Sequence, residues 1–226
     1  MLITFDSVSK HYGTQTKALD DISFTIDSGE FVFLVGNSGA GKTTILRLLI
    51  RDLLPTTGKI SIDTLEVGKL TDKDIPKLRR KVGMIFQDFK VLVDRTVAEN
   101  VAITLEILNK SNSEIHKKVD EVLHLVGLTD KKHLFPSQLS AGELQRTSIA
   151  RAIIGGPKVL LADEPTGNLD PTTAWEILKI LKEINTLGTT IVMATHNVDV
   201  VNSLRKRVIT MRKGKLYKDS KKGKYE

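Results

Sequence analysis

"FVFLVGNSGAGKTT" (residues 31–44) joins a short apolar run to a glycine-rich turn and then to a helical pattern. Its middle part, "GNSGAGKT" (36–43), fits the spacing GxxxxGKT, and the strand before it and the helix after it are the context that this motif requires. Glycines let backbone N–H groups converge on phosphate oxygens, and a helix N-terminus adds partial positive charge. The stretch therefore predicts a P-loop NTPase core of the α/β class.

The same stretch supplies most of the candidate nucleotide-binding residues. Lys42 is expected to bridge the β- and γ-phosphates of ATP, and the Thr43 hydroxyl is expected to coordinate Mg²⁺. Backbone groups around them complete the phosphate cradle. The cradle residues are Gly36, Asn37, Ser38, Gly39, Ala40, Gly41, Lys42, Thr43 and Thr44.

Hydrophobic patterning extends this core in both directions along the chain. Short, nearly continuous apolar runs indicate strands buried on both faces of a parallel sheet, and they lie at 31–35, 82–86, 159–162 and 190–195. Runs with alternating apolar and polar residues indicate a small antiparallel sheet, and they lie at 2–8, 22–26 and 58–63. Helical patterns follow the first and third apolar runs, at 43–54 and 171–184, and Asp170 and Pro171 are the predicted N-cap and first residue of the second helix.

Between residues 96 and 154 the pattern is wholly helical, with helices expected at 96–108, 113–128 and 141–154. The predicted fold is a P-loop core with a mostly parallel sheet, a small N-terminal antiparallel β part and an inserted helical lobe. The core would comprise about 1–95 and 155–211, the lobe about 96–154, and a basic tail 212–226.

Composition limits the function classes. The chain has no cysteine, which excludes disulfides and thiolate-bound metals and suits a reducing cytosol. No apolar run approaches the roughly 18 residues of a membrane span, and the N-terminus lacks the apolar block of a signal peptide, so we expect a protein soluble by itself. The net charge is +7, but residues 212–226 carry +5 of it and aromatic residues are only 5%, so a nucleic-acid-binding face is not indicated. This tail is expected to be a solvated, frayed end, with contact to anionic lipid as the alternative.

Polar residues that follow the apolar runs are candidates for catalysis. "VLLADEP" (159–165) ends a strand in two adjacent carboxylates; Asp163 would hold Mg²⁺ through water, and Glu164 would polarise the attacking water. His196 follows the run at 190–195, where open α/β sheets place ligands, and would contact the γ-phosphate. Gln87 follows the run at 82–86 and offers an uncharged oxygen to Mg²⁺. The catalytic candidates are thus Glu164, His196, Lys42 and Gln87, and the metal-binding candidates are Thr43, Gln87 and Asp163.

Together these residues resemble the nucleotide-binding domain of ABC ATPases over essentially the whole chain. The resemblance implies that Tyr12 stacks on adenine, that Gln87 is the Q-loop glutamine and that His196 is the switch histidine. It also implies that "LSAGE" (139–143) is the signature motif and that "NLD" (168–170), with Asp170, is the D-loop. In this family two copies pair head to tail around ATP, so Ser140 and Gly142 would serve the nucleotide of a partner copy.

The signature departs from the family at one position, because Ala141 stands where the family usually has a glycine. An added methyl group can restrict the backbone, so the sequence predicts slower turnover or weaker ATP-driven pairing. Inactivity is not expected.

"VGMIFQDFKVLVDRTVAENV" (82–101) resembles the cell-division ATPase family FtsE. That resemblance implies a membrane partner of the FtsX type that docks near Gln87–Arg95, a peripheral position at the cytoplasmic face of the plasma membrane, and a mechanical signal to cell-wall hydrolases. Lipoprotein-release and macrolide-efflux ATPases share nearly all these motifs. A soluble ABC ATPase acting on nucleic acid or ribosomes is a further alternative, but such proteins usually carry a long coiled-coil insertion or a second cassette. A simple P-loop kinase would leave Ser140, Gly142 and His196 without a shared purpose.

Overall fold

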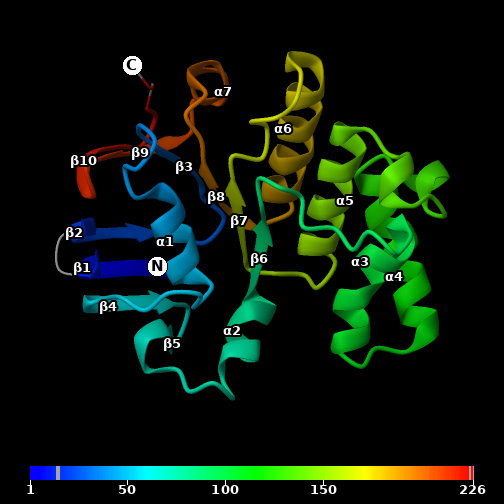
Figure 1. Ribbon diagram of the computed structural model, residues 1–226, viewed down its shortest axis with the longest axis horizontal. Helices are drawn as coiled ribbons and strands as arrows, with labels where there is room; N and C mark the ends of the chain where they lie inside the picture. Colours follow the sequence, from blue (N-terminus) through cyan, green and yellow to red (C-terminus); the bar gives the residue numbers. More distant parts are fainter. Residues whose placement is uncertain (14–15, 224, 226) are drawn as a thin grey trace.

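The computed structural model describes residues 1–13, 16–223 and 225 as two β-sheets with helices around them (Figure 1). The strands are β1 (Ile3–Tyr12), β2 (Thr16–Ile26), β3 (Phe31–Val35), β4 (Thr57–Ile62), β5 (Leu65–Glu66), β6 (Val82–Ile85), β7 (Val159–Asp163), β8 (Thr190–Ala194), β9 (Arg207–Arg212) and β10 (Lys215–Ser220). The α-helices are α1 (Lys42–Leu49), α2 (Ile75–Lys81), α3 (Val97–Ile107), α4 (Asn112–Leu125), α5 (Ala141–Ile153), α6 (Pro171–Thr186) and α7 (Val198–Leu204). Short 3₁₀ turns lie at Val67–Lys69, Thr129–Lys131 and Pro136–Gln138.

The larger sheet has six strands in the order β10-β9-β3-β8-β7-β6. All neighbours pair in parallel except β10, which pairs antiparallel with β9. Alternate side chains of β3 enter different hydrophobic cores, because Phe31, Phe33 and Val35 pack on one face and Val32 and Leu34 on the other. Burial on both faces explains the continuous apolar runs, and the predicted parallel sheet is confirmed.

The smaller sheet is antiparallel, in the order β2-β1-β4-β5, and α1 packs between it and the six-stranded sheet (Figure 1). The rings of Phe5 and Phe24 stack at 4.6 Å on neighbouring strands of this sheet. β1 and β2 are longer than predicted and their pairing contains register shifts after Phe5. These irregularities interrupt the strict alternation on which the sequence prediction depended.

The chain between β6 and β7 forms α3, α4 and α5, which lie together at one end of the molecule, opposite the antiparallel sheet (Figure 1). Ser140 caps α5 in a capping box with Glu143. Asp170 caps α6, whose first residue is Pro171, so the predicted cap at Asp170 is confirmed. Within the described residues, no helix has the length and apolar character needed to cross a bilayer.

The prediction of a frayed C-terminal tail is wrong for residues 215–220, because they form the edge strand β10. Arg207 of β9 binds both carboxylate oxygens of Asp219, at 2.9 and 2.7 Å, and its Nη1 donates to Glu30 at 2.8 Å. Lys215 and Lys218 lie on this edge strand, where lysines oppose further strand pairing. Of the predicted tail, residues 224 and 226 lie outside the described residues.

Candidate nucleotide site

The glycine-rich turn lies between β3 and α1, as predicted, and its backbone requires glycine at two places. Gly36 and Gly41 have φ angles of 148° and 104°, in the region that side chains disfavour. An added Cβ would lie 2.3 Å from the Met211 carbonyl oxygen at Gly36 and 2.8 Å from the Ala18 carbonyl oxygen at Gly41. α1 begins directly after Gly41 with no side-chain cap, so its first N–H groups face an anion site.

Lys42 folds back over this turn. Its Nζ donates to the carbonyl oxygens of Gly36 at 2.7 Å and Asn37 at 3.3 Å, and the residue is only 8% exposed. A buried ammonium needs such partners, and the two carbonyl groups hold it within the turn. The lysine is therefore placed beside the backbone N–H groups of the glycine-rich turn and the start of α1.

Asp163, the last residue of β7, lies next to the start of α1. The Thr43 hydroxyl donates to its Oδ1 at 3.3 Å. Burial raises the pKa of Asp163, the Thr43 hydrogen bond opposes this shift, and the neighbouring Glu164 adds to it. The Thr43 hydroxyl and the partly buried Asp163 carboxylate therefore offer oxygen ligands suited to a cation or a hydrated cation.

Glu164 and His196, which follow the neighbouring strands β7 and β8, contact each other through their side chains. His196 Nδ1 lies 2.8 Å from Glu164 Oε1, and its backbone N–H donates to Oε2 at 3.4 Å. Glu164 adopts a left-handed φ of 47° and is fixed by a hydrogen bond from its N–H to the Ala194 carbonyl at 2.9 Å. This conformation turns the carboxylate from the line of β7 toward the loop after β8.

One open cleft of about 840 Å³ brings most of the predicted site together. Tyr12, Gln87, Asp163, Glu164 and His196 line it with residues 37–44. Gly36 lines an adjacent hollow on the other side of the turn. Sequence reasoning missed four lining residues: Thr16, Lys17 and Ala18, which follow Tyr12 in the next strand, and Tyr225, for which no sequence signal exists.

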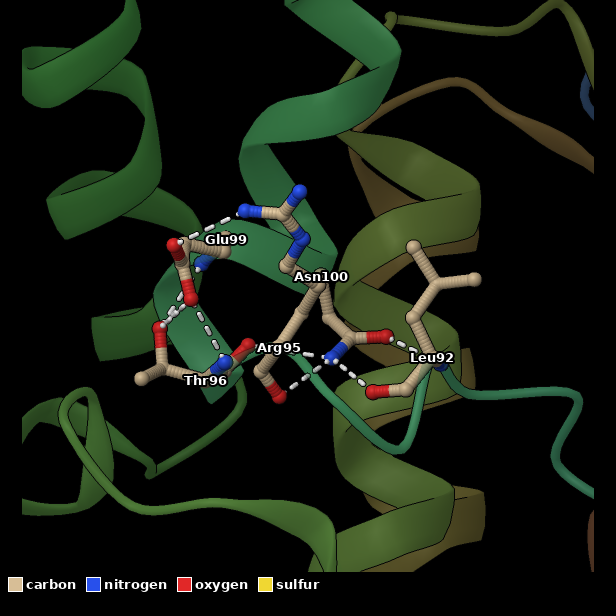
Figure 2. Close-up of polar contacts among 5 residues, drawn as sticks. All are labelled: Leu92, Arg95, Thr96, Glu99 and Asn100. Carbon is tan, nitrogen blue, oxygen red and sulfur yellow. Dashed lines mark hydrogen bonds and ion pairs between the residues drawn. The ribbon is translucent and has the colours of Figure 1, made fainter.

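The segment after Gln87 is fastened to α3 by Asn100, which the sequence reasoning also missed. Figure 2 shows the Asn100 amide pointing at the backbone of this segment. Nδ2 donates to the carbonyl oxygens of Leu92, Arg95 and Thr96, each at 3.0 Å, and Oδ1 accepts from the Leu92 N–H at 2.7 Å. Asn100 is fully buried, so these bonds replace water entirely.

Ser140, Gly142 and Asp170 do not line this cleft among the described residues; they lie together where α5 and α6 begin. Gly142 allows the close contact, because an added Cβ would lie 2.4 Å from Thr173 Cγ2. Farther along, Arg146 pairs with Glu176 at 3.0 Å. The molecule thus carries two separate groups of predicted site residues: the cleft and a pair of adjacent helix starts.

The model of the ABC transporter family matches residues 19–167. The chain belongs to the ABC transporter family. As a member of this ABC ATPase family it binds ATP and hydrolyses it.

Three relatives are similar to this ABC ATPase over nearly their whole length, and each is named cell division ATP-binding protein FtsE. The Bacillus subtilis protein is 51% identical, covering 99% of this chain and 98% of its own. The Mycobacterium tuberculosis protein is 48% identical, covering 100% and 98%. The Escherichia coli protein is 45% identical, covering 96% and 97%. Within the ABC family, the chain belongs with FtsE.

Two solved ABC structures share the fold. A dimeric ATP-binding cassette in a post-hydrolysis state, bound to ADP and Pi, is 33% identical with a TM-score of 0.89, covering 99% of this chain and 100% of the other. A dimeric bacterial ABC transporter cassette is 34% identical with a TM-score of 0.90, and the same shares are covered. The predicted fold class is therefore confirmed.

Proposed function

We propose that this chain is the ATP-hydrolysing subunit of a cell-division membrane complex of the FtsE–FtsX type, in which two copies close around ATP. The cell-division role is supported by the 45–51% identity to FtsE proteins over almost the full chain. The pairing is supported by one observation above all: Ser140 and Gly142 begin α5 outside the cleft that holds the P-loop.

Within the cleft each residue has a proposed role. Backbone N–H groups of residues 36–44 and Lys42 bind the phosphates, and Tyr12, which is 41% exposed, offers a face to adenine. Glu164 accepts a proton from the attacking water, and His196, which is held by Glu164 at 2.8 Å, contacts the γ-phosphate.

Thr43, Asp163 and Gln87 are the proposed Mg²⁺ residues, and their chemistry fits this ion. All three present oxygen atoms to the same cleft, and the Thr43 and Asp163 oxygens already lie 3.3 Å apart. When bound, Mg²⁺ neutralises phosphate charge.

The second group of residues is proposed to complete the cleft of a second copy. Ser140 Oγ and the first N–H groups of α5 form a helix start suited to an anion, with Asp170 at the adjacent start of α6. The dimeric cassettes described above support a homodimer, and its two copies are proposed to pair head to tail. ATP would join the copies, and loss of phosphate would let them part.

A membrane partner of the FtsX type is proposed to dock in a groove of about 600 Å³ between α2, β6 and the C-terminal ends of α3 and α5. Phe86, which lines this groove, immediately precedes the predicted docking segment Gln87–Arg95. Docking there would hold the ATPase at the cytoplasmic face of the plasma membrane and pass closure of the pair to the partner.

The decisive experiment uses Glu164→Gln. This change removes the proposed base but keeps the side chain's size, so the variant is expected to bind ATP, to hydrolyse it at least about a hundredfold more slowly and to accumulate as a dimer. Sedimentation with ATP and Mg²⁺, and phosphate release, are the measurements. Lys42→Ala is the control, because loss of phosphate binding should leave it monomeric. Normal hydrolysis by Glu164→Gln would contradict the assignment of the base.

A further inference from the structure

Arg151, near the C-terminal end of α5, is a partly buried cation without an acidic partner among the described residues. Its Nη2 donates to the Phe89 carbonyl oxygen at 3.3 Å, and no ion pair is formed. Burial lowers the pKa of Arg151, which remains positively charged at neutral pH. A guanidinium has five N–H donors, so most of its capacity to bind a carboxylate is unused.

The groove beside Arg151 is lined by apolar side chains and by arginines. Its apolar lining includes Val82, Met84, Phe86, Ile107, Leu108 and Pro157, and Ile107 is 69% exposed. Arg79, Arg80 and Arg151 also line it, and no carboxylate does so among the described residues. Such a groove complements an amphipathic segment that carries apolar side chains and negative charge.

Arg151 also contacts the segment that carries Gln87. Phe89, whose carbonyl it binds, and Lys90 have left-handed φ angles of 58° and 52°, which is unfavourable for residues other than glycine. Asn100 holds the far end of this segment at Leu92–Thr96 (Figure 2). The Gln87 segment is thus attached twice to the helices that form the groove.

We infer that Arg151 is the recognition charge of the groove and pairs with a carboxylate on the docking segment of the membrane partner. This inference rests on the proposed function. The guanidinium can bind a carboxylate through two N–H groups while Nη2 keeps its bond to Phe89. Docking then fixes Arg151, and through Phe89 it fixes the turn that follows Gln87.

The test measures binding of the purified chain to the FtsX-type membrane protein of the same genome, held in detergent. Arg151→Glu is expected to weaken binding about ten- to a hundredfold, because a charge-assisted pair becomes a repulsion. Arg151→Gln is the second variant, used if the reversed charge of Arg151→Glu disturbs folding. It keeps an amide donor for the Phe89 carbonyl but removes the charge, so its binding should also be weaker than that of the wild type. Lys182→Glu on α6, an exposed lysine outside the groove, is the matched control and should bind normally.

A charge-reversing substitution in the membrane partner identifies the carboxylate that pairs with Arg151. Each Asp or Glu of its cytoplasmic segments is changed to Arg, and one of these changes should restore binding to Arg151→Glu. Wild-type affinity in both folded Arg151 variants, or the absence of any restoring change, overturns the inference while leaving the complex intact. A wild-type chain that does not bind the membrane protein refutes the proposed complex itself.

Discussion

Single residues in the cleft hold unfavourable conformations that the surrounding structure enforces. Glu164 has a left-handed φ of 47°, which costs about 1–2 kcal/mol for a residue with a Cβ. Hydrogen bonds on both sides fix it, from its N–H to Ala194 and from the Gly167 N–H to its own carbonyl. The result is a carboxylate directed at His196, and strain of this kind is typical of functional positions.

The signature residues Ala141 and Gly142 differ in whether their position has room for a side chain. Neither has a positive φ, and Ala141 is the exposed first residue of α5, so its methyl group does not strain the backbone. The conformational reason for expecting slow turnover is therefore absent. We predict that Ala141→Gly changes the ATPase rate less than about twofold and lowers the free energy of unfolding by up to about 1 kcal/mol, because glycine is a poor helix former.

Gly142→Ala is the comparison for that prediction. Its Cβ would lie 2.4 Å from Thr173 Cγ2, so the Thr173 side chain must turn or α5 and α6 must separate. We expect a loss of about 1–3 kcal/mol in urea unfolding and a clear loss of ATP-driven pairing. A larger rate change for Ala141→Gly than for Gly142→Ala would contradict this reading.

Among the elements, α3 depends on one buried amide for its connection to the Gln87 segment. Asn100→Ala leaves the Leu92 N–H and the Arg95 carbonyl without this partner, whereas the Leu92 and Thr96 carbonyls keep the backbone N–H groups of residues 95 and 100. We predict a loss of about 2–4 kcal/mol in the free energy of unfolding, since buried unpaired polar groups are costly. Trypsin should also cut after Lys90 and Arg95 faster than in the wild type.

Asn112→Ala is the control for Asn100→Ala. Asn112 is exposed at the first position of α4, so its replacement should change stability by less than about 0.5 kcal/mol. Equal stability of the two variants would show that the amide does not anchor the segment.

Elements with strong apolar periodicity were predictable, and polar ones were not. The cap at Asp170 and the start of α5 at Ala141 lie where the sequence predicts them. By contrast α2, "IPKLRRK", has one buried residue, and the seven-residue α7 is too short to show a period. β10 was missed because an edge strand rich in lysine lacks the alternation of a half-buried strand.

In the candidate site too, some features were predictable from the apolar runs and others were not. Residues that end the apolar runs, such as Asp163, Glu164 and His196, meet in one cleft because parallel strands end at one edge of the sheet. The bond from Lys42 to Gly36, the left-handed Glu164 and the Asn100 anchor arise from tertiary contacts. No local pattern in the sequence contains them.

At the scale of the whole molecule, two hydrophobic cores share the six-stranded sheet. One joins it to α1 and the antiparallel sheet, and the other joins it to α3–α7. The P-loop belongs to the first side, whereas the starts of α5 and α6 belong to the second. In the proposed homodimer, this separation would let one molecule present half of a nucleotide site on each side. It also makes links between the parts important for stability.

Asp63 provides such a link, because it follows β4 of the small sheet and binds Lys81 of α2 at 2.6 Å and Lys158, just before β7, at 2.9 Å. Hydrogen bonds from Lys81 and then Lys158 lower the pKa of Asp63 from 3.8 to about 2. Since the folded pKa is the lower one, this contribution to stability is fully present above about pH 4 and is lost as the pH falls toward about 2. Asp63→Asn should therefore lower the urea midpoint at about pH 7 and match the wild type increasingly below about pH 4. Asp72→Asn is the control, because Asp72 is an exposed carboxylate without an ion pair in the described chain; its urea midpoint should equal that of the wild type at about pH 7. If Asp63→Asn lowers the urea midpoint by the same amount at every pH, its effect comes from packing and not from the ion pairs.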